Sequence, residues 1–387
     1  MRRKLIIKLS AALILVIALL CTSYIAWFLK EKKPVDILVM NKSAVSGNRV
    51  EHRAAFWVLN KERFVNSSGK AYRQKSGYYG FIPLSPFRNR EYLLREITEE
   101  LADSLSKAYD VAWYVDTYGV SLEEWYSGTA TGVSSRMLYG GLDYGDYLFI
   151  KKMLESNKMV IAEFNFFASP TPHDIRSMVE QLTGVYWSGW SGSYYDNLDY
   201  SQNGEFPLRL VENYEGLNGA LWDYSGPGIV FESHDNKVVV LEYDTHLDVE
   251  VPLVTTSGTT AAKYGVAETV HYPGRFDISY PADTSAVVSY YEIYVNSNGE
   301  KVLSKHNIPC RFPAVTVAAV PGTFLYMAGD YSNIRLPLVT SRLAGSQAFD
   351  FLLYSNDVVS KESFFSKYYY PFVSKIIKDY QSELTKK

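Results

Sequence analysis

The sequence predicts an α/β fold, in which a mostly parallel sheet is flanked by helices and preceded by one N-terminal transmembrane helix. Three observations lead to this prediction. Short apolar runs alternate with amphipathic helical patterns through the body of the chain, as in sheets whose strands are joined by helices. Hydrophobic residues make up 47% of the 387 residues, enough for one large core or two ordinary ones. Residues 9–29 form an uncharged run long enough to cross a bilayer.

The N-terminal segment is predicted to be a membrane anchor. Four basic residues lie within the first eight positions, ahead of the uncharged run. At about 1.5 Å per residue, this run crosses a hydrocarbon core of about 30 Å. A cleaved signal peptide is the alternative, but the run exceeds the usual apolar core of one, and the best cleavage site, at Ala26, has bulky Tyr24 two residues before it. By analogy with short-tailed signal anchors, we expect the body to lie outside the cytoplasm.

Charge and cysteine content limit the partners and sites of the body. Of the 39 basic and 42 acidic residues, seven basic and one acidic lie in residues 1–33, which leaves 32 basic against 41 acidic residues. This formal charge of about −9 argues against nucleic acid and anionic membrane surfaces as partners of the body, because both bind to basic patches. Cys21 and Cys310 form no disulfide framework, since one lies in the predicted span. The six histidines lack paired spacing, so we expect no metal site and no cofactor.

The first half of the body is expected to alternate strands with helices. Strands are predicted at residues 35–41, 109–116 and 158–165. Helices are predicted from Glu51, over residues 90–108 and over residues 143–157. A further helix is expected after the third strand, with Thr171 as its N-cap and Pro172 in its first position.

The second half is less regular. The Trp-rich stretch WSGWSGSYY, residues 187–195, reads as a loop, and VNSNGE, residues 295–300, predicts a β-hairpin turn. Residues 246–285 are expected to form an inserted β layer or a lid. The C-terminal stretch begins as an aromatic helix that Pro371 interrupts or restarts. The predicted domains are the anchor, an α/β core, and a β-rich insertion with the C-terminal completion of the fold: residues 1–33, 34–245 and 246–387.

Polar residues end the predicted strands, where a parallel sheet binds ligands. Asn41, Asp116 and Asn165 all fall at such carboxyl ends. Glu163 shares a strand face with Asn165, because side chains alternate with a period of two. The alternative is that these residues only cap turns and helix starts.

Several motifs together resemble a known superfamily. The motifs are DTYGVSLEEWYSG, LYGGLDYGDYLFIKKML, VIAEFN, GPGIVFESHDNKVVVLEYD and PAVTVAAVPGTFLYMAGDYSN. In this order they resemble the class I glutamine-amidotransferase-like superfamily, which in the broad sense includes ThuA-like proteins and the trimerisation domains of some β-galactosidases. The resemblance covers most of residues 35–387. It implies a flavodoxin-like, mostly parallel sheet followed by a C-terminal β-hairpin region.

The chain departs from that superfamily at the nucleophile. A working glutaminase of this class needs a Cys on a sharp strand-to-helix elbow, with a His and a Glu in reach. No Gly-x-Cys-x-Gly occurs in the sequence, and Cys310 lies in NIPCRFPA, a predicted loop before a late strand. Glutamine hydrolysis is therefore not expected.

Carbohydrate chemistry is the expectation that the remaining residues support. It needs two carboxylates across a groove and aromatic walls for the sugar faces. Acids are available at Asp116, Glu123, Glu124 and Glu163. Aromatic walls are available at Trp125, Tyr139, Trp187, Trp190, Tyr194 and Tyr195. The alternative is that the paired glutamates are solvated loop charges and that the Trp-rich stretch packs over the sheet.

Nine residues are the candidates for a site. The candidate catalytic residues are Asp116, Glu163 and His52. His52 is included because it lies near the crevice after the first strand, although a structural histidine is the alternative. The candidate ligand-binding residues are Asn41, Asn165, Tyr118, Trp125, Trp187 and Trp190.

The expected function is that of a membrane-anchored extracytoplasmic protein that binds or presents an envelope or extracellular polysaccharide. One alternative is a carboxylate-dependent glycan-processing enzyme, and the sequence leaves open whether the protein is an enzyme. Another alternative is a non-catalytic oligomerisation subunit of a membrane assembly, since an oligomer is compatible with the sequence. The expected partners are a polysaccharide and the membrane, which the N-terminal helix crosses.

Overall fold

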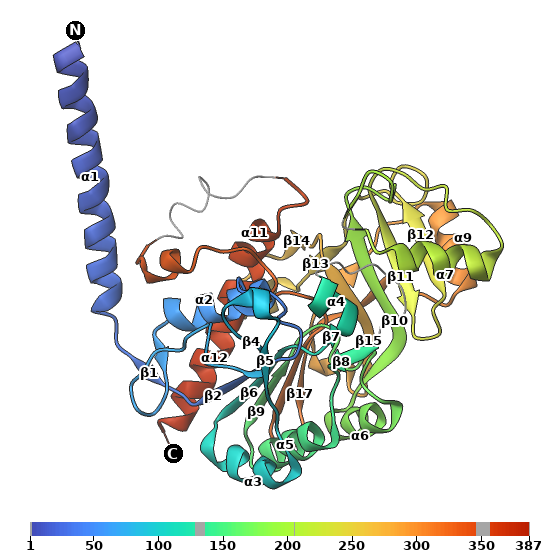
Figure 1. Cartoon of the computed structure of the whole chain (residues 1–387), viewed down its shortest axis with the longest axis horizontal. Helices are drawn as coiled ribbons and strands as arrows, with labels where there is room; N and C mark the ends of the chain where they lie inside the picture. The colour runs from blue at the N-terminus through green and yellow to red at the C-terminus, as the bar shows by residue number, and fades with distance from the viewer. Residues whose placement is uncertain (1, 128–135, 205, 346–356, 387) are drawn as a thin grey trace.

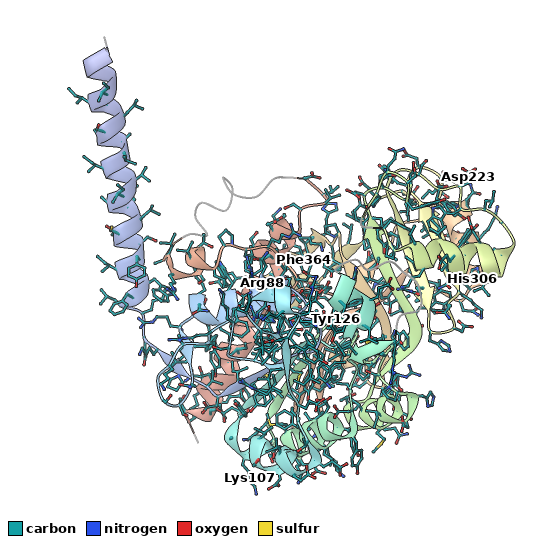
Figure 2. All side chains as sticks on the ribbon, viewed as in Figure 1. Arg88, Lys107, Tyr126, Asp223, His306 and Phe364 are labelled. Carbon is teal, nitrogen blue, oxygen red and sulfur yellow. The ribbon has the colours of Figure 1, made fainter. Side chains whose placement is uncertain are left out.

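A computed structural model of the chain describes residues 2–127, 136–204, 206–345 and 357–386. The N-terminal helix α1 (Arg2–Phe28) projects away from a body that contains two main sheets (Figure 1). Within α1, the stretch Ile6–Phe28 is long and apolar enough to cross a membrane or to be a signal sequence. Side chains crowd the body but stand apart from one another along α1 (Figure 2).

The larger sheet has ten strands and is mixed. Their order is β14 (Thr269–His271), β13 (Leu253–Thr255), β16 (Val287–Glu292), β17 (Arg311–Ala319), β18 (Thr323–Met327), β9 (Met159–Ala162), β6 (Val111–Asp116), β2 (Ile37–Asn41), β4 (Tyr79–Pro83) and β5 (Tyr92–Arg95). The five consecutive strands from β18 to β4 run parallel. The strands outside them pair antiparallel.

The expected α/β class is therefore confirmed, but the mostly parallel sheet is not. Parallel strands need long crossovers, usually helical, whereas short connections join antiparallel neighbours. The turn between β17 and β18 spans only residues 320–322, and β4 leads to β5 through residues 84–91. These short connections account for the antiparallel pairs β17–β18 and β4–β5.

Helices cover both faces of the parallel strands. One face carries α3 (Glu99–Ala108), α5 (Tyr144–Glu155) and α6 (His173–Thr183). The other carries α2 (Arg53–Lys61) and α12 (Tyr370–Leu384), and α8 (Gly258–Tyr264) packs against α12 (Figure 1). The core lies between these layers, where the strand residues of β2, β6 and β9 are almost completely buried.

The second sheet is antiparallel and has four strands. Their order is β12 (Val238–Glu242), β11 (Gly228–Ser233), β10 (Val185–Tyr195) and β15 (Arg275–Pro281). Helices α7 (Leu208–Asn218) and α9 (Ser297–Lys305) pack beside β12 (Figure 1). This sheet stands at the end of the molecule opposite α1.

The predicted loop at residues 187–195 is wrong, because these residues belong to strand β10. The glycines that suggested a loop are needed by the strand. Gly189 has a φ of +87° where the pairing register with β15 shifts, as at a β-bulge. A Cβ on Gly192 would lie 2.3 Å from the ring of Phe276, so only glycine lets β10 pair closely there.

Several predicted boundaries also move. The helix expected over residues 90–108 begins only at Glu99, because Tyr92–Arg95 forms β5. The strand expected at residues 158–165 is β9, which ends at Ala162. Helix α6 begins at His173, and Thr171 is not its cap, since the Thr171 hydroxyl accepts a hydrogen bond from the Leu142 N–H at 3.0 Å.

The C-terminal half differs from expectation at one turn and agrees at another. VNSNGE is not a hairpin turn, because Asn296 caps helix α9 by accepting hydrogen bonds from the N–H groups of Asn298 and Gly299. The aromatic C-terminal helix is confirmed. Helix α11 (Lys361–Phe364) continues through a π-helical turn, Phe365–Tyr369, into α12, which restarts with Pro371 in its first turn.

Candidate functional site

The order of the parallel strands reverses between β2 and β6. From β2 the chain moves to β4 on one side, and the later parallel strands β6, β9 and β18 lie on the other. In open α/β sheets, ligands bind outside the carboxyl ends of the strands at such a reversal. Asn41 and Asp116 are paired in register here, so two of the predicted site residues meet at this point.

Asn41 and His52 form a buried pair behind the strand ends. The Asn41 amide nitrogen lies 2.5 Å from His52 Nδ1, and the Asn41 oxygen accepts a hydrogen bond from the Ser43 N–H at 2.8 Å. Both side chains are fully buried. Burial lowers the pKa of His52 to about 3, so its ring is neutral at physiological pH. This pair braces the loop after β2 from the inside.

Asp116 occupies a more open setting at the end of β6, where it is half-buried. Its Oδ1 accepts hydrogen bonds from Ser43 Oγ and from the Tyr118 N–H, both at 2.8 Å. Burial, followed by repulsion from Asp330, raises the pKa of Asp116 to about 7, and Arg275 opposes this shift. Asp116 therefore changes charge near neutral pH.

Glu163 is enclosed by hydrogen-bond donors. Its Oε1 accepts hydrogen bonds from Trp113 Nε1 at 2.9 Å, Ser332 Oγ at 2.7 Å and Tyr369 OH at 3.0 Å. Its Oε2 accepts one from the Ser332 N–H at 3.0 Å. The side chain has no exposed surface, and burial raises its pKa to about 8. Glu163 thereby ties β6 to the segment after β18 and to the C-terminal helix.

A cleft of about 410 Å³ opens between the ends of β6 and β9 and the four-stranded sheet. Strands β10, β11 and β15 form one wall, and the segments after β6 and β9 form the other. The lining of the cleft includes Tyr118, Asn165, Trp187, Ser193, Tyr195 and Arg275.

The aromatic side chains of the cleft are held in place by their neighbours. Trp187 Nε1 donates a hydrogen bond to the Trp190 carbonyl at 2.9 Å, and the Arg176 guanidinium lies 5.2 Å from the Trp187 ring. The ring of Tyr195 lies 4.6 Å from that of Phe206. Tyr118, across the cleft, is 40% exposed. Tyr118, Trp187 and Tyr195 are thus three of the aromatic side chains that line the cleft, and the last two are held by neighbours outside it.

Asp277 joins the two walls of the cleft. Its carboxylate accepts hydrogen bonds from the Asn165 N–H at 2.8 Å, from Ser191 Oγ at 2.6 Å and from Tyr326 OH at 2.7 Å. Asn165 has a φ of +65°, a conformation that asparagine tolerates better than most residues. Since Asp277 is completely buried, it fixes the position of Asn165 without itself reaching the ligand space.

The two arginines of the cleft differ in their partners. Arg209 forms a bidentate ion pair with Glu232, with Nη2 and Oε2 2.6 Å apart. Arg275 has no ion pair within 4 Å among the residues described, and its residue is exposed. Nearby Tyr195, followed by Asp330, Tyr118 and Asp116, raises the pKa of its guanidinium. Arg275 therefore leaves its guanidinium available to a ligand.

Three of the nine predicted site residues line the cleft: Tyr118, Asn165 and Trp187. Six lie outside the lining of this described cavity: Asn41, His52, Asp116, Trp125, Glu163 and Trp190. Trp125 is fully buried 4.9 Å from the ring of Phe81, and its Nε1 donates to the Arg90 carbonyl. Asp116 stays close to the cleft, because its Oδ1 binds the backbone of Tyr118.

Sequence reasoning did not single out Arg275 or Asp277. Arg275 begins a strand and has no motif around it, so the sequence gives no signal for its role. Asp277 carries a weak signal, since an acid within the apolar strand RFDISYP must be hydrogen-bonded if it is buried. Within the described residues, no group of three or more His, Cys, Asp or Glu side chains is placed to hold a metal ion.

Comparisons with known proteins give no family for the chain. No family model matches it. No curated protein matches it either. Among solved structures, a protein from Parabacteroides merdae described as ThuA-like is similar with a TM-score of 0.35 and 10% identity, over 76% of this chain and 79% of that one. A similarity of this size assigns neither a family nor a function, and the superfamily indicated by the motifs stays a prediction.

Proposed function

We propose that this protein binds a polysaccharide in the cleft between its two sheets, outside the cytoplasm, while α1 anchors it in the membrane. The observation that supports the proposal most is the composition of the cleft. Tyr118, Trp187 and Tyr195 supply aromatic rings, and Ser193 and Asn165 supply polar groups beside them.

A sugar ring matches such a lining in two ways. Its C–H faces pack on aromatic rings, and its hydroxyl groups exchange hydrogen bonds with serine, asparagine and tyrosine side chains. The volume of about 410 Å³ lies within the usual range for ligand sites, about 300–1,000 Å³. The cleft is also open to solvent, so a long glycan can extend beyond it.

Arg275 narrows the class of glycan. A guanidinium binds a carboxylate through two parallel hydrogen bonds, which a hydroxyl cannot match in strength. Since Arg275 has no ion pair within 4 Å in the described part of the chain, a uronic acid or another acidic sugar is the favoured ligand.

A glycan array with the full chain in detergent tests this proposal. Trp187→Ala should weaken binding about tenfold, a loss of about 1.4 kcal/mol. Trp190→Ala is the matched control, because Trp190 lies on the same strand but outside the cleft lining. Binding to no glycan, or equal losses in the two variants, would remove the support for a glycan site in this cleft.

A carboxylate-dependent glycan-processing enzyme is the second candidate. It is favoured by Asp116 and Asp330, whose mutual repulsion contributes to a pKa of about 7 for Asp116. A carboxyl group with such a pKa serves as a general acid at neutral pH. New reducing ends released from a bound glycan, and lost in Asp116→Asn, would establish this activity; intact glycan after long incubation would reject it.

A further inference from the structure

Hydrogen bonds connect the body to α1 near the carboxyl end of the helix. The Ala344 N–H donates a hydrogen bond to the Ser23 carbonyl at 3.0 Å, and Ser23 Oγ donates one to the Ala344 carbonyl at 2.6 Å. Trp27 Nε1 donates to the Asn60 carbonyl at 3.1 Å. Figure 1 shows the rest of α1 standing clear of the body.

Arg63 completes this joint by capping α1. The last carbonyls of a helix have no partner within the helix. Arg63 Nη1 donates to the Phe28 carbonyl and, at 2.7 Å, to the Lys30 carbonyl. Its guanidinium also lies 5.3 Å from the rings of Trp27 and Phe28. The joint is therefore a set of specific contacts and not a free linker.

The joint sets the depth of the body in the membrane. If α1 spans the bilayer, Ser23 lies about 7.5 Å along the helix from Phe28, the last residue of the apolar stretch, at about 1.5 Å per residue. The apolar stretch Ile6–Phe28 is about 35 Å long on the same basis, slightly more than a hydrocarbon core of about 30 Å. On these lengths Ala344, bonded to Ser23, lies about 3–5 Å inside the hydrocarbon, just below the headgroups.

Backbone at this depth needs its polar groups satisfied within the protein. Several backbone groups of residues 337–344 meet that requirement. The Ala344 N–H and carbonyl are both bonded to Ser23, and the Leu343 carbonyl accepts a hydrogen bond from Lys61 Nζ at 2.5 Å. The Leu343 N–H donates to the Thr340 carbonyl at 3.2 Å.

The side chains of residues 337–344 suit the same place. Val339 is 70% exposed, one of the most exposed large apolar side chains of the body. Arg342 follows it and Arg335 precedes the segment, and both are exposed. An apolar tip with flanking arginines fits the interface of a bilayer, where the tip enters the acyl boundary and the cations meet phosphates.

We infer that residues 337–344 form a second membrane contact beside α1, and that the occupant of this surface is the phospholipid bilayer itself. With two contacts, the body has a fixed tilt on the membrane, and its cleft stays at a fixed height. The inference rests on α1 spanning the membrane and is independent of glycan binding.

Depth-dependent fluorescence quenching tests this contact in proteoliposomes of phosphatidylethanolamine and phosphatidylglycerol. The full chain, with Cys21 and Cys310 replaced by Ala, carries an environment-sensitive fluorophore on Val339→Cys. Leu101→Cys is the matched control: Leu101 is 44% exposed and lies on α3 with Lys107, which Figure 2 places at the end of the body away from α1. Nitroxide lipids labelled just below the headgroup should quench the probe at 339 several-fold more than the probe at 101, and aqueous iodide should do the reverse.

Equal quenching of the two probes by the lipid would overturn the inference, even if the protein still binds glycans. Release of the chain from the vesicles by carbonate would overturn it as well, because α1 would then not span. A second variant tests the joint. Arg63→Ala should reduce lipid quenching at 339 while the chain stays in the membrane, whereas Arg88→Ala, an exposed arginine away from α1, should not (Figure 2). Identical quenching in these two variants would contradict the role of the joint.

Discussion

Two neighbouring parallel strands, β6 and β9, each lead to a carboxylate, and the two carboxylates have opposite surroundings. Glu163, just after β9, accepts four hydrogen bonds and is completely buried. Asp116, at the end of β6, accepts two hydrogen bonds on one oxygen and remains half-buried next to the cleft.

The difference shows what separates an architectural acid from a candidate functional one. Both carboxyls have a raised pKa, chiefly because of burial, so the pKa alone does not distinguish them. The distinction lies in the remaining hydrogen-bonding capacity. Both oxygens of Glu163 accept hydrogen bonds, from donors in three parts of the chain. Both hydrogen bonds to Asp116 end on Oδ1, and neither uses Oδ2.

The largest expected effect is on stability, from Glu163→Gln. Trp113 Nε1 donates to one oxygen and the Ser332 N–H to the other, and neither group can become an acceptor. The glutamine NH₂ must therefore face a buried N–H in either orientation, at a cost on the order of 1–3 kcal/mol. Thermal unfolding followed by circular dichroism should show a melting temperature several degrees lower.

Asp116→Asn provides the contrast to that variant. The oxygen of the new asparagine can accept the same two hydrogen bonds as Asp116 Oδ1. The melting temperature of this variant should therefore stay within about a degree of the parent, since substitutions that break no buried interaction usually cost under about 0.5 kcal/mol. Equal losses of stability in the two variants would show that both carboxylates have a structural role, which would contradict the proposed difference between Glu163 and Asp116.

The next largest effect concerns ligand affinity at Arg275. Arg275→Gln should weaken binding of an acidic oligosaccharide about tenfold, because charge-assisted bidentate hydrogen bonds are about twice as strong as neutral ones. Binding of the matching neutral oligosaccharide should change much less. Titration calorimetry measures the affinity for each oligosaccharide. An equal loss of affinity for the two would mean that Arg275 does not recognise the carboxylate of the sugar.

A smaller effect is expected in the pH dependence of stability. Burial raises the pKa of Glu163 to about 8 and that of Asp116 to about 7 in the folded state. Ordinary unfolded values are about 4, so between about pH 4.5 and 8 the folded state binds more protons than the unfolded state. The contribution of these two groups to the free energy of unfolding therefore falls as pH rises through this window.

Glu163→Gln removes one of the two titrating groups, so the free energy of unfolding should fall less steeply with pH up to about pH 8. In Asp116→Asn the slope should be reduced only up to about pH 7. Urea unfolding at several pH values measures the slopes. Parallel slopes in the parent and in Glu163→Gln would contradict the raised pKa of Glu163.

The smallest effect is expected at Cys310, which precedes β17 and is not at the end of β6 or β9. Burial raises the pKa of its thiol, so the reactive thiolate is scarce at neutral pH. Cys310→Ser should leave glycan binding, any turnover and the melting temperature nearly unchanged. Loss of an activity in a folded Cys310→Ser protein would instead revive a thiol mechanism.

Three of the five parallel strands, β2, β6 and β9, were predicted from sequence because their buried residues form continuous apolar runs. Strand β10 was not predictable, because its glycines are required by a bulge and by the close approach of Phe276, and these are contacts with distant residues. The same limit applies to α9, since the turn-like sequence VNSNGE is also a good helix cap.

The site followed a similar pattern. Tyr118 and Asn165 could be predicted, because they follow the carboxyl ends of the parallel strands β6 and β9. The roles of Trp187 and Trp190 could not be separated by sequence, since the bulge between them sets which one enters the cleft. Arg275 reaches the cleft only because β15 pairs with β10, far from it in sequence.

A crystal structure of the full chain bound to an acidic oligosaccharide tests the proposed glycan site most directly. We expect a sugar ring packed against Trp187 or Tyr195 in the cleft, with its carboxylate within hydrogen-bonding distance of the Arg275 guanidinium. A sugar bound on another surface, with the cleft empty at saturating ligand, would contradict it.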